Sequence, residues 1–159
     1  MRILIVAAMV GAAFGLVACG KNDSKNSDGS GSVSVSGSGD HLSMTGSNGE
    51  KVEIGTGASA KLPAYMPMYP GGTVTSSFSG SGKDGSGGVV VFHVNAAPAQ
   101  IIAFYKQKAA AAGMADTMNA EMGATSTYVA SNDKTKQSLS VSATKGADGS
   151  DVQLTWGAK

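Results

Sequence analysis

The sequence predicts an α+β fold, in which one antiparallel β-sheet carries a single helix packed on one face, in the order ββαββββ. Three observations predict it. Short segments on both sides of residues 98–112 alternate apolar and polar residues. Glycine-rich turns separate these segments, as in sheets built from hairpins. Residues 98–112 themselves repeat apolar side chains at helical spacing, which gives the helix one face to bury against the sheet.

An apolar segment at the N-terminus has the organisation of an export signal. The positive charge of Arg2 precedes an apolar run over residues 3–17, which predicts a signal peptide at residues 1–18. A transmembrane helix is one alternative, but this run would reach only about 22 Å, and a bilayer core is about 30 Å thick. A conventional signal peptide is another, but it prefers a small residue where this chain has Leu16.

The end of this segment resembles the lipobox of bacterial lipoproteins. Leu16, Val17 and Ala18 precede Cys19, and Gly20 follows it. The resemblance implies that a dedicated peptidase recognises these residues and cuts before Cys19, whose sulfur receives diacylglycerol. We therefore expect a chain that is held to a membrane of the cell envelope by lipid on Cys19. Because no Asp follows this cysteine, the resemblance favours the periplasmic side of the outer membrane in a Gram-negative host.

Residues 19–61 are expected to form the lipidated N-terminus and a flexible linker. Gly, Ser, Asn and Asp dominate most of this stretch, and such a composition buries too little apolar surface to offset the entropy of ordering. A hairpin at residues 41–54 is the one ordered element expected there. A three-residue loop places Met44 opposite Val52, whereas a two-residue turn would place it opposite the charged Glu53.

The α+β domain is expected over residues 62–159 and begins with two strands. Val74 and Phe78 share one face of the first strand, and residues 89–94 are apolar on both faces, as in a covered central strand. Residues 80–88 form a loose connection that contains a GxGxxG pattern. Because this pattern precedes a strand and not a helix, it does not predict a dinucleotide site.

The single helix is expected over residues 98–112. Pro98 suits the first helical position, and Gly113 suits the left-handed residue just beyond the end. Ala97 is a poor N-cap, so Asn95 is expected to replace it. The apolar residues that share one face of this helix are Ile101, Ile102, Phe104, Tyr105, Ala109 and Ala112.

The segment at residues 114–122 is ambiguous between strand and helix. Its methionines recur at the parity of a strand and also at the helical spacing of four. Flanking glycines favour a strand, in which Met118 and Met122 would fall on the buried side.

Three more strands are expected after it, the first being a short one at residues 127–130. The last two alternate cleanly over residues 138–143 and 151–156, and Asp148-Gly149 is a strong hairpin signal between them. A two-residue turn at this pair would place Val141 opposite Trp156.

Three short motifs resemble a small domain found in envelope lipoproteins of Gram-negative bacteria. They are Leu62-Pro63, then Tyr69-Pro70-Gly71, and later Phe104-Tyr105. In that domain an LP…YPG segment precedes two strands and a helix that ends in Phe-Tyr. The resemblance covers roughly residues 62–156 and implies the fold and the tethered location, but no activity. Ala97 departs from the Ser or Asp that usually precedes the helix proline.

Charge and cysteine content narrow the range of functions. Once Arg2 is removed, 11 basic side chains balance the 11 acidic ones, so the mature chain has no net field that would attract nucleic acid. Cys19 is the sole cysteine, so the domain cannot be held by disulfides. We expect a membrane contact through lipid, an envelope protein as a further partner, and no cofactor.

No combination of residues predicts catalysis. The chain has two histidines, His41 in the linker and His93 in the first central strand, and no acidic residue adjoins His93 in sequence. The leading hypothesis is a non-enzymatic binding or scaffolding domain that uses the exposed sheet face or residues 66–70 as its contact surface. The alternative is a periplasmic Cu(I)-binding protein that uses the thioethers of Met66 and Met68.

Overall fold

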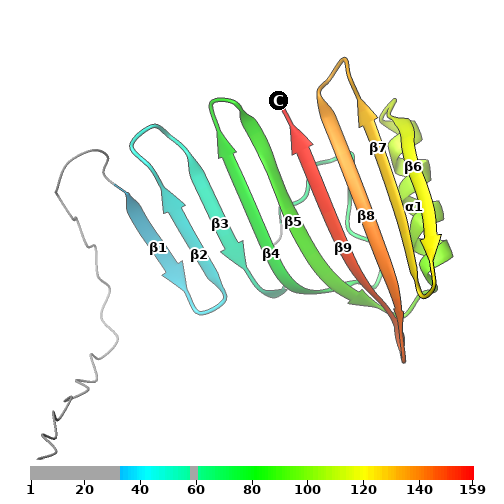
Figure 1. Cartoon of the computed structure of the whole chain (residues 1–159). Helices are drawn as coiled ribbons and strands as arrows, with labels where there is room; N and C mark the ends of the chain where they lie inside the picture. The colour runs from blue at the N-terminus through cyan, green and yellow to red at the C-terminus, as the bar shows by residue number, and fades with distance from the viewer. Residues whose placement is uncertain (1–32, 58–60) are drawn as a thin grey trace, which may run out of the picture.

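The structure, a computed structural model, describes residues 33–57 and 61–159. In this part of the chain nine strands form one antiparallel sheet, and α1 (Pro98–Ala111) packs against one of its faces (Figure 1). The strands are β1 (Ser34–Ser38), β2 (His41–Thr45), β3 (Lys51–Gly55), β4 (Thr73–Gly82), β5 (Gly85–Val94), β6 (Ala115–Met122), β7 (Thr125–Asn132), β8 (Gln137–Gly146) and β9 (Gly149–Ala158).

The strands from β4 onward confirm the predicted order ββαββββ. In space the order is β1-β2-β3-β4-β5-β9-β8-β7-β6, so the C-terminal strand β9 lies between β5 and β8. The helix carries the chain from the middle of the sheet to its far edge, from which three hairpins lead back to the centre. Figure 1 shows α1 behind β6, β7 and β8, so that the face toward the viewer carries no helix. We call this the open face.

Side chains fill the space between α1 and the sheet. Tyr105 and Ile101 of the helix have no exposed surface, and neither do Phe92 and Leu154 of the two central strands. Burying each such side chain contributes about 1.5–3 kcal/mol, which exceeds what helix propensity supplies. The other fully or nearly buried apolar residues of this core are Met66, Val90, Val94, Ile102, Ala109, Met114, Tyr128, Ala130, Leu139, Val141, Ala143, Val152 and Trp156.

The segment between β3 and β4 extends this core beside the helix. Met66 is fully buried, and Leu62, Tyr65 and Met68 pack against the core. The Tyr65 hydroxyl donates to the Gly157 carbonyl, 3.1 Å away. The segment therefore covers the part of the sheet's helix side that α1 leaves free.

The helix begins at Pro98 as predicted, but its N-cap is Ala97 and not Asn95. The side chain of Gln100 forms half of a capping box, because its Oε1 accepts from the Ala97 backbone N–H at 3.1 Å, whereas Ala97 has no side-chain oxygen to cap the first turn. At the other end Gly113 has a φ of +68°, the left-handed conformation that the sequence predicts there.

The first hairpin has the predicted register. Met44 pairs with Val52, as a three-residue loop requires. The linker predicted over residues 19–61 contains one more strand than the expected hairpin at 41–54, because β1 joins this hairpin at residues 34–38, and β3 pairs with β4. Its remaining residues 19–32 and 58–60 lie outside the described part, as does the predicted signal peptide.

The last hairpin differs from its prediction by two residues. Gly146 pairs with Gly149, so the turn consists of Ala147 and Asp148, and Val141 faces Leu154 instead of Trp156. Gly149 is needed for a close approach, since a Cβ there would overlap the Val94 carbonyl. A shift of two residues keeps every side chain on its predicted face.

The connection between β4 and β5 is tighter than expected. Both strands continue through the glycines until Gly82 pairs with Gly85, leaving Lys83 and Asp84 as the turn. The GxGxxG pattern is therefore a hairpin.

Two β-bulges reverse the side on which apolar residues lie. In β4 the register shifts between Val74 and Ser76, so Val74 faces the helix side while Phe78 lies on the open face. In β6 it shifts between Asp116 and Met118, which confirms a strand but leaves Met118 46% exposed and Met122 79% exposed. The expectation that both methionines are buried is wrong for this reason.

Candidate functional site

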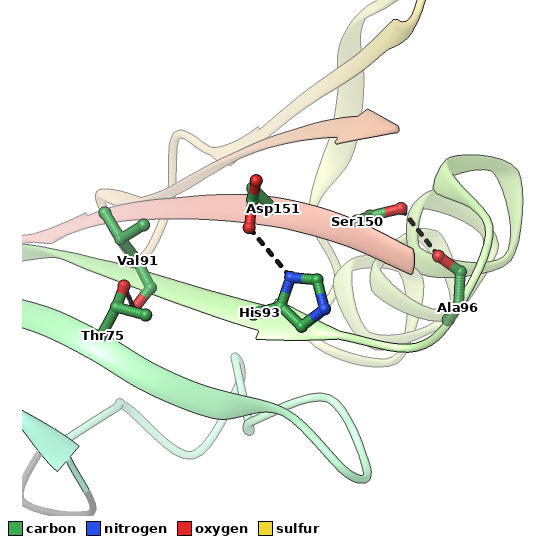
Figure 2. Close-up of polar contacts among 6 residues, drawn as sticks. All are labelled: Thr75, Val91, His93, Ala96, Ser150 and Asp151. Atoms are coloured by element: carbon green, nitrogen blue, oxygen red, sulfur yellow. Dashed lines mark hydrogen bonds and ion pairs between the residues drawn. The ribbon is translucent and has the colours of Figure 1, made fainter. Parts of the chain in front are cut away.

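The structure brings His93 and Asp151 together, although no acidic residue adjoins His93 in the sequence. They are directly opposite each other on β5 and β9. The His93 Nδ1 atom lies 2.9 Å from Asp151 Oδ1, and Figure 2 shows the two side chains pointing toward one another. The hydrogen bond to Asp151 raises the pKa of His93 above its ordinary value of 6.5, because it favours the protonated imidazole.

This pair lies on an exposed surface. The two side chains are 41% and 70% exposed, and they lie on the open face near the start of β9. Among the described residues Asp151 is the only side chain that the His93 ring bonds, so no hydroxyl or thiol is hydrogen-bonded to the ring, although Thr73 is its partner on β4. Figure 2 also shows Ser150, which faces the other way and donates to the Ala96 carbonyl at 2.7 Å, fixing the approach to α1.

The pair Met66 and Met68 does not form an open thioether site. Met66 is fully buried, and Met68 is packed against the same core. The Pro67 carbonyl between them accepts from the Tyr105 hydroxyl at 3.2 Å, which fixes the segment on the helix. Residues 33–57 and 61–159 also contain no cluster of three His, Cys, Asp or Glu residues that could hold a metal ion. Residues 66–70 are thus mainly a cover for the core.

The open face over β1 to β4 carries large apolar side chains that no described segment covers. We call Val35, Leu42, Met44, Ile54 and Phe78 the apolar patch. Each is between 36% and 50% exposed. Cross-strand pairing joins them, because partners on adjacent strands share a face: Val35 pairs with Met44, Leu42 with Ile54, and Ile54 with Phe78. Contiguous exposed apolar surface of this kind marks an interaction site in soluble proteins.

The other side of the same strands is polar. Ser34, Ser36 and Ser38 lie there on β1, and Ser43 pairs with Glu53 on the next two strands. The three N-terminal strands therefore have the one-sided pattern of a sheet that packs one face against something. Over β7 to β9, in contrast, the open face is rich in Ser and Thr.

A hollow of about 800 Å³ adjoins the apolar patch on the open face. Its floor contains Gly80, Gly87 and Gly157, which are consecutive partners across β4, β5 and β9, and we call these three the glycine trough. Interior strand glycines weaken a sheet and often mark a place where a ligand or another chain approaches closely. A Cβ at Gly80 would meet nothing nearer than 3.8 Å, so packing within the chain does not require glycine there.

Neither the apolar patch nor the glycine trough was predicted from the sequence, because both depend on the order of the strands in the sheet. The patch combines residues from four strands, and the trough combines residues from three, one of which is the last in the chain. The sequence does contain one signal of the patch. Apolar and polar residues alternate over residues 41–54, and this alternation predicted the hairpin that carries three of the patch residues. The predicted lipid-attachment residues Leu16, Val17, Ala18, Cys19 and Gly20 lie outside the described residues.

Comparison with known proteins adds one relationship. A family model described as START domain-like matches residues 74–154, which run from β4 into β9 and include α1. No curated protein matches the chain, and no solved structure does. Among residues 33–57 and 61–159, no helix has the length and apolarity that crossing a bilayer requires.

Proposed function

The chain belongs to the START domain-like family, and from this premise we propose that it is a lipid-anchored, non-enzymatic binding or scaffolding domain of the cell envelope. The observation that carries the proposal is the apolar patch on the open face. Family membership is compatible with binding, and the patch supplies a surface for it. Strands β1 to β3, which hold most of the patch, lie outside the matched residues 74–154.

The anchoring part of the proposal is supported by residues 16–20. Lipid on Cys19 would bind a membrane firmly, because each buried methylene contributes about 0.8 kcal/mol and two acyl chains act together. Residues 20–33 join Cys19 to β1, which is the strand at the edge of the described sheet and carries the first residue of the patch.

The binding part is supported by the cost of leaving the patch in water. Apolar surface removed from water contributes about 25 cal/mol per Å², so a partner that covers these five side chains gains directly from doing so. The polar face of the same strands offers no comparable gain. The non-enzymatic part is supported by the setting of the His93–Asp151 pair, which lies on exposed surface and not in a closed pocket.

Crosslinking in intact cells tests the binding part. A photoreactive amino acid placed at Phe78, on the β4 side of the patch, should give a crosslinked product. The same probe at Ser36, which lies on the polar side of β1, is the matched control and should give much less. Equal yields from the two positions, or no product from Phe78, would contradict the proposal.

Mass spectrometry of the chain isolated from membranes tests the anchor. We expect a chain that begins at Cys19 and carries acyl groups there. The Cys19→Ser variant should leave the membrane fraction. An unmodified thiol at residue 19, or a different N-terminus, would contradict the anchoring part and leave the binding part standing.

A further inference from the structure

We propose that the occupant of the open face is a second copy of this chain, bound face to face across a two-fold axis. This inference rests on the proposed binding function and names its partner. Three observations on the open face carry it: two parallel rows of opposite shape, the absence of charge from both rows, and a footprint that suffices for a dimer.

The first row is a ridge. Leu42, Ile54, Phe78 and Val89 are consecutive partners across β2, β3, β4 and β5, and we call them the apolar ridge. The first three are 38–48% exposed. The row continues across β9 as Thr155, which pairs with Val89.

The second row is the glycine trough, which lies two residues further along the same strands. Gly80 stands beside Phe78 on β4, Gly87 beside Val89 on β5, and Gly157 beside Thr155 on β9. On these three strands every ridge residue therefore has a glycine as its neighbour on the same face. On β2 and β3 the neighbours are Met44 and Val52.

Consider a two-fold axis that runs parallel to the rows and midway between them. It places the ridge row of one copy over the trough row of the other, and each strand over the same strand of the partner. Phe78 of one copy then faces Gly80 of the other, and Val89 faces Gly87. Stacked sheets lie about 10 Å apart, so a ring as large as that of Phe78 packs best opposite a small residue. On β2 and β3 the same axis sets Leu42 against Met44 and Ile54 against Val52, so two apolar side chains meet there. The arrangement is isologous, and each contact occurs twice.

Charge is absent from both rows. The ridge row runs through Gly37, Leu42, Ile54, Phe78, Val89, Thr155, Ser140 and Val129, and the trough row through Val35, Met44, Val52, Gly80, Gly87, Gly157, Ser138 and Ser131. None of these residues is charged, and depletion of charge is the compositional mark of an interface core. The charged side chains that line the hollow, among them Lys83, Asp84 and Lys136, lie outside the two rows, so the rows themselves contain no ion to bury.

The face is also large enough. Strands lie about 4.8 Å apart and alternate residues about 6.8 Å apart, so nine strands and the two rows cover about 40 Å by 14 Å. That footprint is about 550 Å² on each copy, or about 1,100 Å² in total, which exceeds the roughly 1,000 Å² that a specific protein interface needs. A bilayer surface would cover the patch too, but it offers no ridge to fill the glycine trough.

Sedimentation equilibrium of the full chain, purified as the cell makes it in a density-matched detergent with micelles in excess, tests the inference. We expect twice the chain mass. Gly80→Phe fills the trough, and Phe78→Gly removes the ridge, so each should raise the dimer Kd at least tenfold. The double variant carrying both substitutions exchanges ridge and trough and should restore the dimer. Ser36→Phe, on the polar side of β1, is the control and should leave the Kd unchanged.

Thermal unfolding of each variant shows whether it has folded. If one single variant has not folded, the double variant still tests whether ridge and trough can be exchanged. A chain that stays monomeric at every concentration overturns the inference. So does a dimer that survives both single substitutions, or a double variant that fails to associate. A Phe78 crosslink to lipid or to another protein would also refute the second copy, yet it would support the binding proposal.

Discussion

The indole ring of Trp156 packs directly on the backbone of Gly88, its partner across β5 and β9. A Cβ built on Gly88 would overlap the indole ring and also the Phe78 carbonyl. The absence of a side chain at Gly88 leaves room for the ring over the central strands, where Trp156 is only 8% exposed.

We expect Gly88→Ala to destabilise the fold by about 1–3 kcal/mol, because the added methyl group must displace backbone as well as the ring. Chemical denaturation followed by the fluorescence of Trp156 measures this loss. Gly46→Ala is the matched control, since a Cβ there meets nothing nearer than 3.9 Å. Equal stability of the two variants would show that the Trp156 ring can move aside without a loss of stability.

The hydrogen bond from His93 to Asp151 predicts a pH dependence. The raised pKa of His93 means that the folded state holds the proton more tightly than the unfolded chain does. The stabilisation is therefore complete below pH 6.5 and is lost as the pH rises through the raised pKa. We expect Asp151→Asn to lower the His93 titration midpoint in NMR spectra. Asp133→Asn, in the distant β7–β8 turn, should leave it in place, and an unmoved midpoint in Asp151→Asn would refute the assignment.

Because Met66 is buried, a substitution that shrinks its side chain should destabilise the fold more than one that only replaces its sulfur. Met66→Ala should cost about 2–5 kcal/mol through the cavity it leaves. Met66→Leu keeps the volume and should cost less than about 1.5 kcal/mol. Copper titration in the presence of a Cu(I) reductant should not distinguish Met66→Leu from the parent chain. Loss of tight Cu(I) binding in that variant alone would restore the thioether hypothesis.

A buried tyrosine fixes the edge strand β6. The Tyr128 hydroxyl donates to Asp116 Oδ1 at 2.5 Å, and burial raises the pKa of Tyr128. The bulge after Asp116 is what turns this carboxylate toward the helix side. We expect Tyr128→Phe and Asp116→Ala each to destabilise the fold by about 1–2 kcal/mol, since the acceptor is charged. A double-mutant cycle should show that the two losses are not additive, and full additivity would mean that the bond contributes nothing.

Local patterns predicted the elements of this fold well, and they failed where geometry depends on distant partners. Alternation gave the hairpin register that pairs Met44 with Val52, because a one-residue slip would have put apolar side chains opposite charged ones. The bulges at Thr75 and Thr117 left no such trace, since each inserts a single polar residue into a run of polar residues. Every error about which side chains are buried in β4 and β6 follows from these two positions.

The candidate site was less predictable for the same reason. His93 and Asp151 are 58 residues apart, and their pairing depends on β9 entering the sheet beside β5. The open face combines strands from both ends of the described chain. An apolar residue in β1 looks like part of a linker until its partner in β2 is known.

The position of β9 sets a condition on how the molecule can fold. This strand joins the half of the sheet made by β1 to β5 to the half made by β6 to β8, yet it follows all of them in the sequence. Until residues 149–158 pair, the other strands form two partial sheets with unpaired inner edges. Joining the two halves is a closure between segments distant in sequence, which is intrinsically slow. Truncation within β9 would therefore destabilise the fold strongly, because both halves of the sheet would keep an unpaired edge.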